Sequence, residues 1–143
     1  MVGLGISVAI GTVAVGSLFQ LFKAEDRSGA HLEAATQSRT VTRWLFRDVR
    51  QAEGTTLEDG VRVDSASFEW TKDDGTSEAC QYSLTGTALK RECDSGTVTI
   101  GRSVQAIQFQ RAGNLVHIDL TVSGNGNPPV EQGLNLTVLM RGM

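Results

Sequence analysis

The feature that most constrains the fold is the start of the chain, because residues 1–22 carry no charged side chain. As an α-helix at ~1.5 Å per residue this segment would be ~33 Å long, about the thickness of the hydrocarbon core of a bilayer. A cleaved signal peptide would begin with basic residues, and a buried soluble helix rarely runs this far without a charge. We weigh all three interpretations and favour a helix that inserts into a membrane.

Small residues recur at four-residue spacing within this apolar segment. Such stripes allow another helix to approach closely, although glycine is also simply more common in membrane helices than in soluble ones. We expect close helix–helix packing at Gly3, Ser7, Gly11, Thr12 and Gly16.

The helical pattern continues beyond the apolar segment, over residues 23–53, without a proline. Apolar and small residues recur there at steps of three and four, which places them on one stripe of an amphipathic helix: Ala30, Ala34, Ser38, Val41, Leu45, Val49 and Ala52. The stripe should pack on a sheet, with Val41, Leu45, Val49 and Ala52 in the helix–sheet core. Gly54 suits the position just after the helix.

Four arginines fall nearly opposite that stripe: Arg39, Arg43, Arg47 and Arg50. A row of this kind is usually a solvated face. The alternatives are contacts to lipid phosphates, to acidic neighbours or to DNA.

From residue 54 to residue 143 the hydrophobic period changes from that of a helix to that of β-strands. Strand-length runs are separated by turn-forming residues, and the short gaps indicate hairpins. The expected strands lie at 61–64, 66–71, 78–84, 88–93, 97–101, 103–110, 115–123 and 134–140. The sequence therefore predicts an α+β fold in which the long helix packs on an antiparallel meander sheet.

The two cysteines fall on neighbouring expected strands. If Thr85–Ala88 form the loop of a hairpin, Leu84 faces Leu89, Tyr82 faces Arg91, and Cys80 faces Cys93. Opposed residues on antiparallel strands have Cα atoms ~4.5–5.5 Å apart, which is within disulfide range. Two free buried thiols are the alternative, and beyond a membrane helix, in an oxidising compartment, we favour the bridge.

Motifs for catalysis and for cofactor or metal binding do not stand out from this sequence. His31 and His117 have no partner at ligand spacing, and Asp73-Asp74 is more typical of a turn than of a calcium site. Residues 54–143 hold seven basic and eleven acidic residues, which argues against attraction to nucleic acid. We expect a protein that is not an enzyme and that has no cofactor or metal.

Several segments of the chain together resemble the type IV pilin and pseudopilin superfamily. "MVGLGISVAIG" resembles the segment after the leader-peptidase site in prepilins, whose cleavage-site glycine and nearby glutamate would then lie just before Met1. "LFRDVRQAEG" resembles the helix end of W-type minor pilins and J-type minor pseudopilins. "YSLTGTALKREC", "VTIGRSVQAIQFQ", "LVHIDLTVS" and "LNLTVLMRG" resemble the hairpins and closing strand of those proteins.

The resemblance implies a structural subunit of a type IV pilus-like filament. Such a subunit waits in the bacterial inner membrane with its sheet domain in the periplasm. Assembly machinery then extracts it, and residues 1–22 pack with copies of the chain or with other pilins in an extracellular or periplasmic filament. The alternative is a single-pass, membrane-anchored periplasmic binding domain that does not polymerise.

Overall fold

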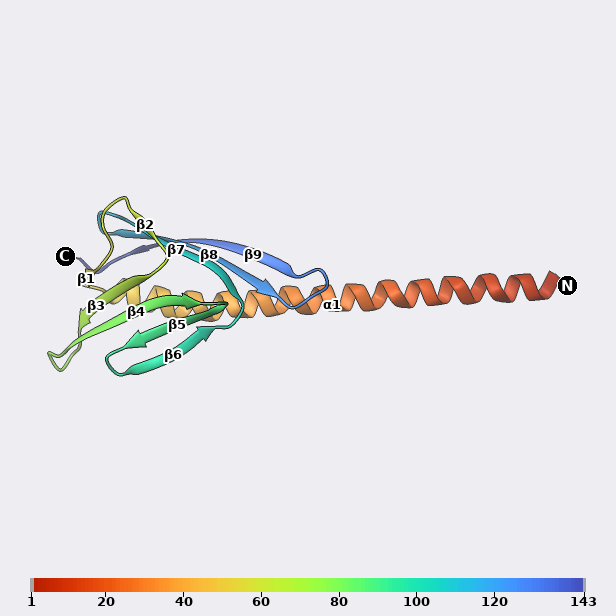
Figure 1. The fold of residues 1–143 in the computed structure, drawn as a ribbon, viewed down its shortest axis with the longest axis horizontal. Helices are drawn as coiled ribbons and strands as arrows, with labels where there is room; N and C mark the ends of the chain where they lie inside the picture. The colour runs from red at the N-terminus through yellow and green to blue at the C-terminus, as the bar shows by residue number, and fades with distance from the viewer. Residues whose placement is uncertain (1, 143) are drawn as a thin grey trace.

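The structure is a computed structural model that describes residues 2–142, with side chains described for residue 18 and from residue 20 onward. Its longest element is a single helix, α1 (Val2–Gln51), with no proline to interrupt its backbone hydrogen bonds. The N-terminal half of α1 projects beyond the sheets, which gather around its C-terminal half (Figure 1).

The rest of the described chain is β-structure, and the predicted α+β class is confirmed. One sheet has the order β1-β3-β4-β5-β6 and the other has the order β2-β7-β8-β9, with antiparallel pairing in both. The strands of the first are β1 (Gly54–Thr55), β3 (Ala66–Thr71), β4 (Ser77–Thr85), β5 (Ala88–Cys93) and β6 (Gly96–Gly101). Those of the second are β2 (Arg62–Val63), β7 (Val104–Ala112), β8 (Leu115–Gly124) and β9 (Val130–Leu139).

The single meander expected from the hairpin spacing is replaced by two sheets. The break lies between β6 and β7, where the chain bends at Arg102 and Ser103, directly after Gly101. A Cβ at Gly101 would stand 2.8 Å from methyl groups of both Val104 and Val41, so the chain here lies directly against the helix. Because β7 then pairs with β2 rather than with β6, the two sheets pack on α1 separately.

The predicted end of the helix is wrong by two residues, because α1 ends at Gln51 and not at Glu53. Gly54 is not a capping glycine with a left-handed backbone; it opens β1 and pairs with Glu69. The cause is tertiary: the N–H of Glu53 donates to the carbonyl of Glu69 at 2.8 Å, which draws the chain into the sheet.

The core lies where the two sheets meet the helix. Val41, Leu45, Val49 and Ala52 are each fully buried in it. Three aromatic rings join the two sheets, since Phe68 and Tyr82 of the first sheet lie with their centroids 6.1 Å and 6.4 Å from that of Phe109 in the second. Such tilted contacts add to the area that the rings bury.

The β4–β5 hairpin has the predicted register, with Leu84 opposite Leu89, Tyr82 opposite Arg91 and Cys80 opposite Cys93. The predicted disulfide is confirmed, with Cα atoms 4.1 Å apart. The sequence separation of its cysteines is 13. In the chain-entropy model a closed loop of about that size contributes ~3 kcal/mol to stability.

The loop after β8 is held against the helix. The backbone N–H and the side-chain amide of Asn125 donate to the two carboxylate oxygens of Glu33, at 3.0 Å and 3.3 Å. Beside this contact a Cβ on Gly124 would overlap the carbonyl oxygen of Ala30 and would stand 2.9 Å from its Cα. Only glycine lets the end of β8 approach the helix backbone this closely.

We therefore expect Gly124→Ala to lower the free energy of unfolding by about 1–3 kcal/mol or more, as overpacking against backbone does. The matched control is Gly133→Ala in β9, where an added Cβ meets no atom within 4 Å and should change stability by less than ~0.5 kcal/mol. Urea unfolding of both variants checks this, and equal effects would contradict the described helix–loop contact.

Candidate functional site

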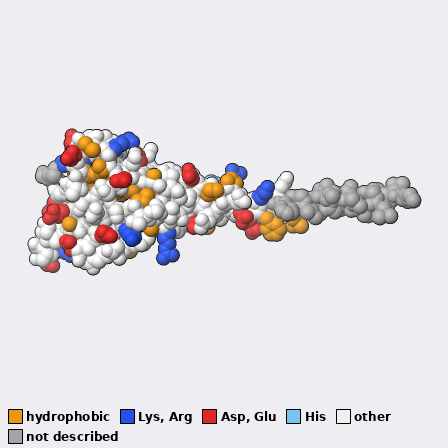
Figure 2. Space-filling model, viewed as in Figure 1, with side chains coloured by type: hydrophobic (Ala, Val, Ile, Leu, Met, Phe, Trp, Pro, Cys, Tyr) orange, Lys and Arg blue, Asp and Glu red, His pale blue; other side chains and the backbone are white. Residues whose placement is uncertain are grey.

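The part of α1 that projects from the sheets exposes apolar side chains. Leu21 and Phe22 are 65% and 63% exposed, and Leu18 is more than half exposed. Leu32, where the helix already contacts the sheets, is 70% exposed. Among the helix residues whose side chains the structure describes, the first that is buried is Ala30. Figure 2 shows hydrophobic side chains gathered on this projecting part of the helix. Clustered exposed apolar surface is typical of contacts with proteins or membranes.

Among the residues whose side chains the structure describes, no helix is both long and apolar enough to cross a membrane. The segment 1–22, predicted to do so, lies almost entirely outside them. The predicted packing residues also lie outside the described side chains: Gly3, Ser7, Gly11, Thr12 and Gly16.

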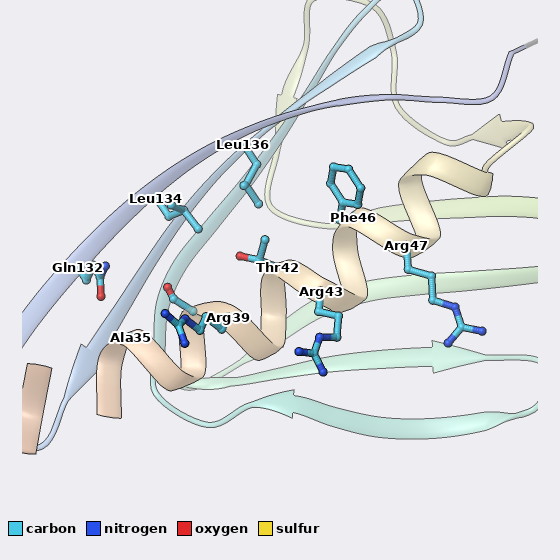
Figure 3. Close-up of a pocket in the computed structure, with 10 residues that line it drawn as sticks. Ala35, Arg39, Thr42, Arg43, Phe46, Arg47, Gln132, Leu134 and Leu136 are labelled. Carbon is cyan, nitrogen blue, oxygen red and sulfur yellow. The ribbon is translucent and has the colours of Figure 1, made fainter. Parts of the chain in front are cut away.

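A groove of about 770 Å³ runs between α1 and the last strand, β9 (Figure 3). Ala35, Thr42 and Phe46 line it from the helix, and the half-buried Leu134 and Leu136 line it from the strand. Phe46 is 44% exposed and also lines a second groove of about 620 Å³, formed with residues 137–141. The helix and β9 thus leave an apolar channel between them.

Three arginines of the predicted row lie at the outer rim of this channel, beyond Ala35, Thr42 and Phe46. Arg39, Arg43 and Arg47 line the groove and are all exposed. Figure 3 shows Arg43 and Arg47 extending from α1 on the side away from Leu134 and Leu136. The guanidinium of Arg50 lies 5.7 Å from the ring centroid of Phe46, so a positive charge also lies over the aromatic ring at the end of the channel.

A buried charged cluster joins α1 to the first sheet. Asp48 is fully buried and accepts hydrogen bonds from the Tyr82 hydroxyl and from Nε of Arg91, both at 2.5 Å. A third bond runs from Arg91 Nη2 to the other carboxylate oxygen at 3.2 Å. The guanidinium of Arg91 also lies over the ring of Trp44, 4.8 Å from its centroid. The cluster is paired throughout, which is the condition for burying a charge at tolerable cost.

The cluster shifts the pKa of both of its sheet residues. Burial, followed by the charge of Asp48, raises the pKa of Tyr82 far above its usual value of 10.0. Burial alone would lower the pKa of Arg91, but the hydrogen bond to Asp48 and the charge of Asp48 outweigh it and raise that pKa. Both shifts favour the protonated side chains that donate to the carboxylate.

The Tyr82 shift predicts a loss of stability at high pH. Because its pKa is raised in the folded state, Tyr82 contributes stability that is fully present below pH ~10, the unfolded value, and is lost as pH rises above it. The loss should reach ~1.4 kcal/mol per pH unit. In Tyr82→Phe this part of the pH dependence should vanish, and because Tyr82 is the only tyrosine, the tyrosinate absorbance on unfolding reports it directly. Identical alkaline slopes in the two proteins would contradict this.

Sequence reasoning missed Asp48, although a signal was present. Asp48 lies three residues after Leu45 and four before Ala52, so helical periodicity places it on the buried stripe. An acidic residue at such a position needs a buried cationic partner, because burying an unpaired charge is costly. Tyr82 and Arg91 were predicted to face each other, but nothing local to the sequence places them over the helix.

Other ionisable groups in the described part of the chain form ordinary structural contacts. The ligand atoms of Glu78, Cys80 and Cys93 lie within 4.8 Å of one another, but both sulfurs are in the disulfide. Asp74 accepts hydrogen bonds from the backbone and hydroxyl of Thr76, as a turn aspartate does. His117 Nδ1 lies 3.0 Å from the hydroxyl of Thr137 on the neighbouring strand.

No protein-family model, no curated protein and no solved structure matches this chain significantly.

Proposed function

We propose that this chain is a structural subunit of a type IV pilus-like filament (a pilin, minor pilin or pseudopilin) that assembles through its N-terminal apolar helix. In this proposal the subunit resides in the bacterial inner membrane with its sheet domain in the periplasm. It is then extracted by the pilus assembly machinery into a filament with copies of itself or with other pilins. It has no enzymatic activity.

The observation that carries the proposal is that the charge-free segment at the start of the chain and the amphipathic segment after it form one continuous helix, α1. The helix has 50 residues, ~75 Å at ~1.5 Å per residue, and the first buried side chain in its described part is that of Ala30. An apolar helix projecting this far from its own domain must be covered by lipid or by other helices. Since lipid tails are as apolar as the helix, exchange between the two environments costs little.

The amphipathic second half supports the same proposal. One stripe of residues 30–52 is buried by the two sheets while the arginine row stays exposed, so the sheets are fixed to one side of the helix. The resemblance of several segments to pilins and pseudopilins is the reason for proposing that the subunit assembles into a filament. A single-pass anchored periplasmic domain that does not polymerise is the competing proposal.

Gly11→Leu separates the two proposals. Leucine keeps the segment apolar and raises its helix propensity, so membrane insertion and folding of the sheets should survive. In a filament the leucine side chain would hold neighbouring backbones apart, whereas a helix surrounded by lipid would accommodate it. We expect the variant to reach a normal level in the membrane and to be depleted from sheared surface filaments.

Gly29→Leu is the matched control, because it makes the same change in the same helix where an added Cβ meets no atom within 4 Å. It should enter filaments at the wild-type level. Normal incorporation of Gly11→Leu would favour the anchored domain over the filament subunit.

A further inference from the structure

The outer edge of β9 has few of the features that normally protect the edge of a sheet, and its one charged residue is Glu131 near its start. Between residues 130 and 139 there is no proline and no lysine, and the pairing with β8 runs through all ten residues without a bulge. The edge strands β1 and β2 are only two residues long, and β6 meets β5 with a register shift. Within the described chain, β9 is thus the one long and regular edge, and such an edge is ready to pair with another strand.

The space beside that edge has room for a further strand. The groove of about 770 Å³ lies between β9 and the flank of α1. Leu134 and Leu136 face the helix across it (Figure 3). At ~100° per residue, Ala35, Thr42 and Phe46 follow next to the buried stripe, and the arginine row follows beyond them. A strand added to β9 would therefore set its helix-facing side chains on Phe46, with the arginines at the outer rim. Arg43 and Arg47 extend away from β9 in the structure, so their long side chains would have to turn toward the added strand (Figure 3).

The chemistry of the channel specifies the partner. Arg39, Arg43 and Arg47 take part in none of the ion pairs found among the described residues. Four helix residues rise ~6 Å and two strand residues span ~6.6–6.8 Å, so carboxylates on alternate strand residues would meet successive arginines. The hydroxyl oxygen of Thr42, buried at the floor, also has no hydrogen-bond partner in the described structure.

We propose that the groove between α1 and β9 binds an extended acidic segment of another polypeptide. That segment adds a strand to the edge of β9 and places carboxylates on alternate residues against Arg39, Arg43 and Arg47. Main-chain hydrogen bonds to β9 supply affinity, and the arginine row with the Phe46 surface selects an acidic side-chain pattern. The inference goes beyond filament assembly, because it holds for a polymerising subunit and for an anchored domain alike.

The test is a titration of the full chain in neutral detergent with a fluorescein-labelled heptapeptide in which valine and glutamate alternate. Fluorescence anisotropy should show saturable binding. A peptide of the same composition with its glutamates consecutive at one end should bind more weakly. Isotope-edited infrared spectroscopy of the ¹³C-labelled peptide should report β-structure in the bound state. Equal binding of the two peptides would overturn strand addition.

Arg43→Glu should weaken the binding of the alternating peptide about tenfold or more, because it replaces a charge-assisted hydrogen bond with repulsion. Arg102→Glu is the matched control: it makes the same change of charge at an exposed arginine outside the groove and should leave the affinity unchanged. An equal loss in both variants would mean that bulk charge alone attracts the peptide, and would overturn the proposal. If Arg43→Glu instead spares peptide binding and weakens association with mixed micelles containing phosphatidylglycerol, the arginines bind lipid and the proposal is wrong.

Discussion

Asp48→Ala is expected to lower the free energy of unfolding by about 3–5 kcal/mol, the cost of breaking a buried ion pair from one side. The side chain of Asp48 is fully buried and that of Arg91 is 12% exposed. Removal of the carboxylate leaves the guanidinium charge without its partner in a largely dry site and leaves the Tyr82 hydroxyl without its acceptor. Urea unfolding of the full chain, followed by tryptophan fluorescence, measures the loss.

The matched control is Asp119→Ala. Asp119 also pairs with an arginine, Arg62, at 3.6 Å, but the Arg62 and Asp119 side chains are 60% and 44% exposed to water. A surface pair of this kind contributes about 0–1 kcal/mol. A double-mutant cycle with Arg91→Met should show strong coupling for Asp48, because the two groups belong to one network. Similar losses from the Asp48 and Asp119 variants would refute the buried cluster.

Leu45→Ala is the second large effect, with an expected loss of about 2–5 kcal/mol. Leu45 is fully buried at the centre of the helix stripe, and truncation removes its apolar contacts and leaves a cavity that the two sheets can fill only in part. Arg43→Ala, two residues away on the exposed side of α1, should cost less than about 0.5 kcal/mol. The two substitutions remove side chains of substantial size from the same helix, so their difference measures which side of α1 faces the sheets. Equal losses would mean that the helix is rotated.

Together these variants connect stability with the proposed interactions. Asp48 and Leu45 hold α1 to the sheets, and this attachment fixes the arginine row beside β9. A variant that loosens the helix should therefore also weaken the binding of an acidic strand, whereas Arg43→Glu should weaken binding with little loss of stability, because glutamate and arginine have similar helix propensities.

Local patterns in the sequence determined most of the secondary structure. Helical periodicity identifies the stripe that contains Val41 and Leu45, because each turn of a helix exposes the same side to its neighbours. The register of the β4–β5 hairpin follows from the length of its loop, and the disulfide follows from that register, since residues at equal distances from a short loop must face each other. Strand alternation puts Ile118 and Leu120 on one face of β8 for a similar local reason, and both are buried.

Only the tertiary structure decided how the strands pair and how the two sheets are placed around the helix. Whether β7 would pair with β6 or with β2 depends on the bend that follows Gly101, a residue whose close contact with Val41 joins positions far apart in the chain. Nothing in the sequence near Asp48 identifies Tyr82 and Arg91 as its partners. Nothing in the sequence near Gly124 shows that a Cβ there would overlap the backbone of Ala30. The groove beside β9 is set in the same way, by the angle at which one sheet edge passes a helix. Periodicity and loop length act over a few residues, whereas these contacts arise from long-range packing of whole elements.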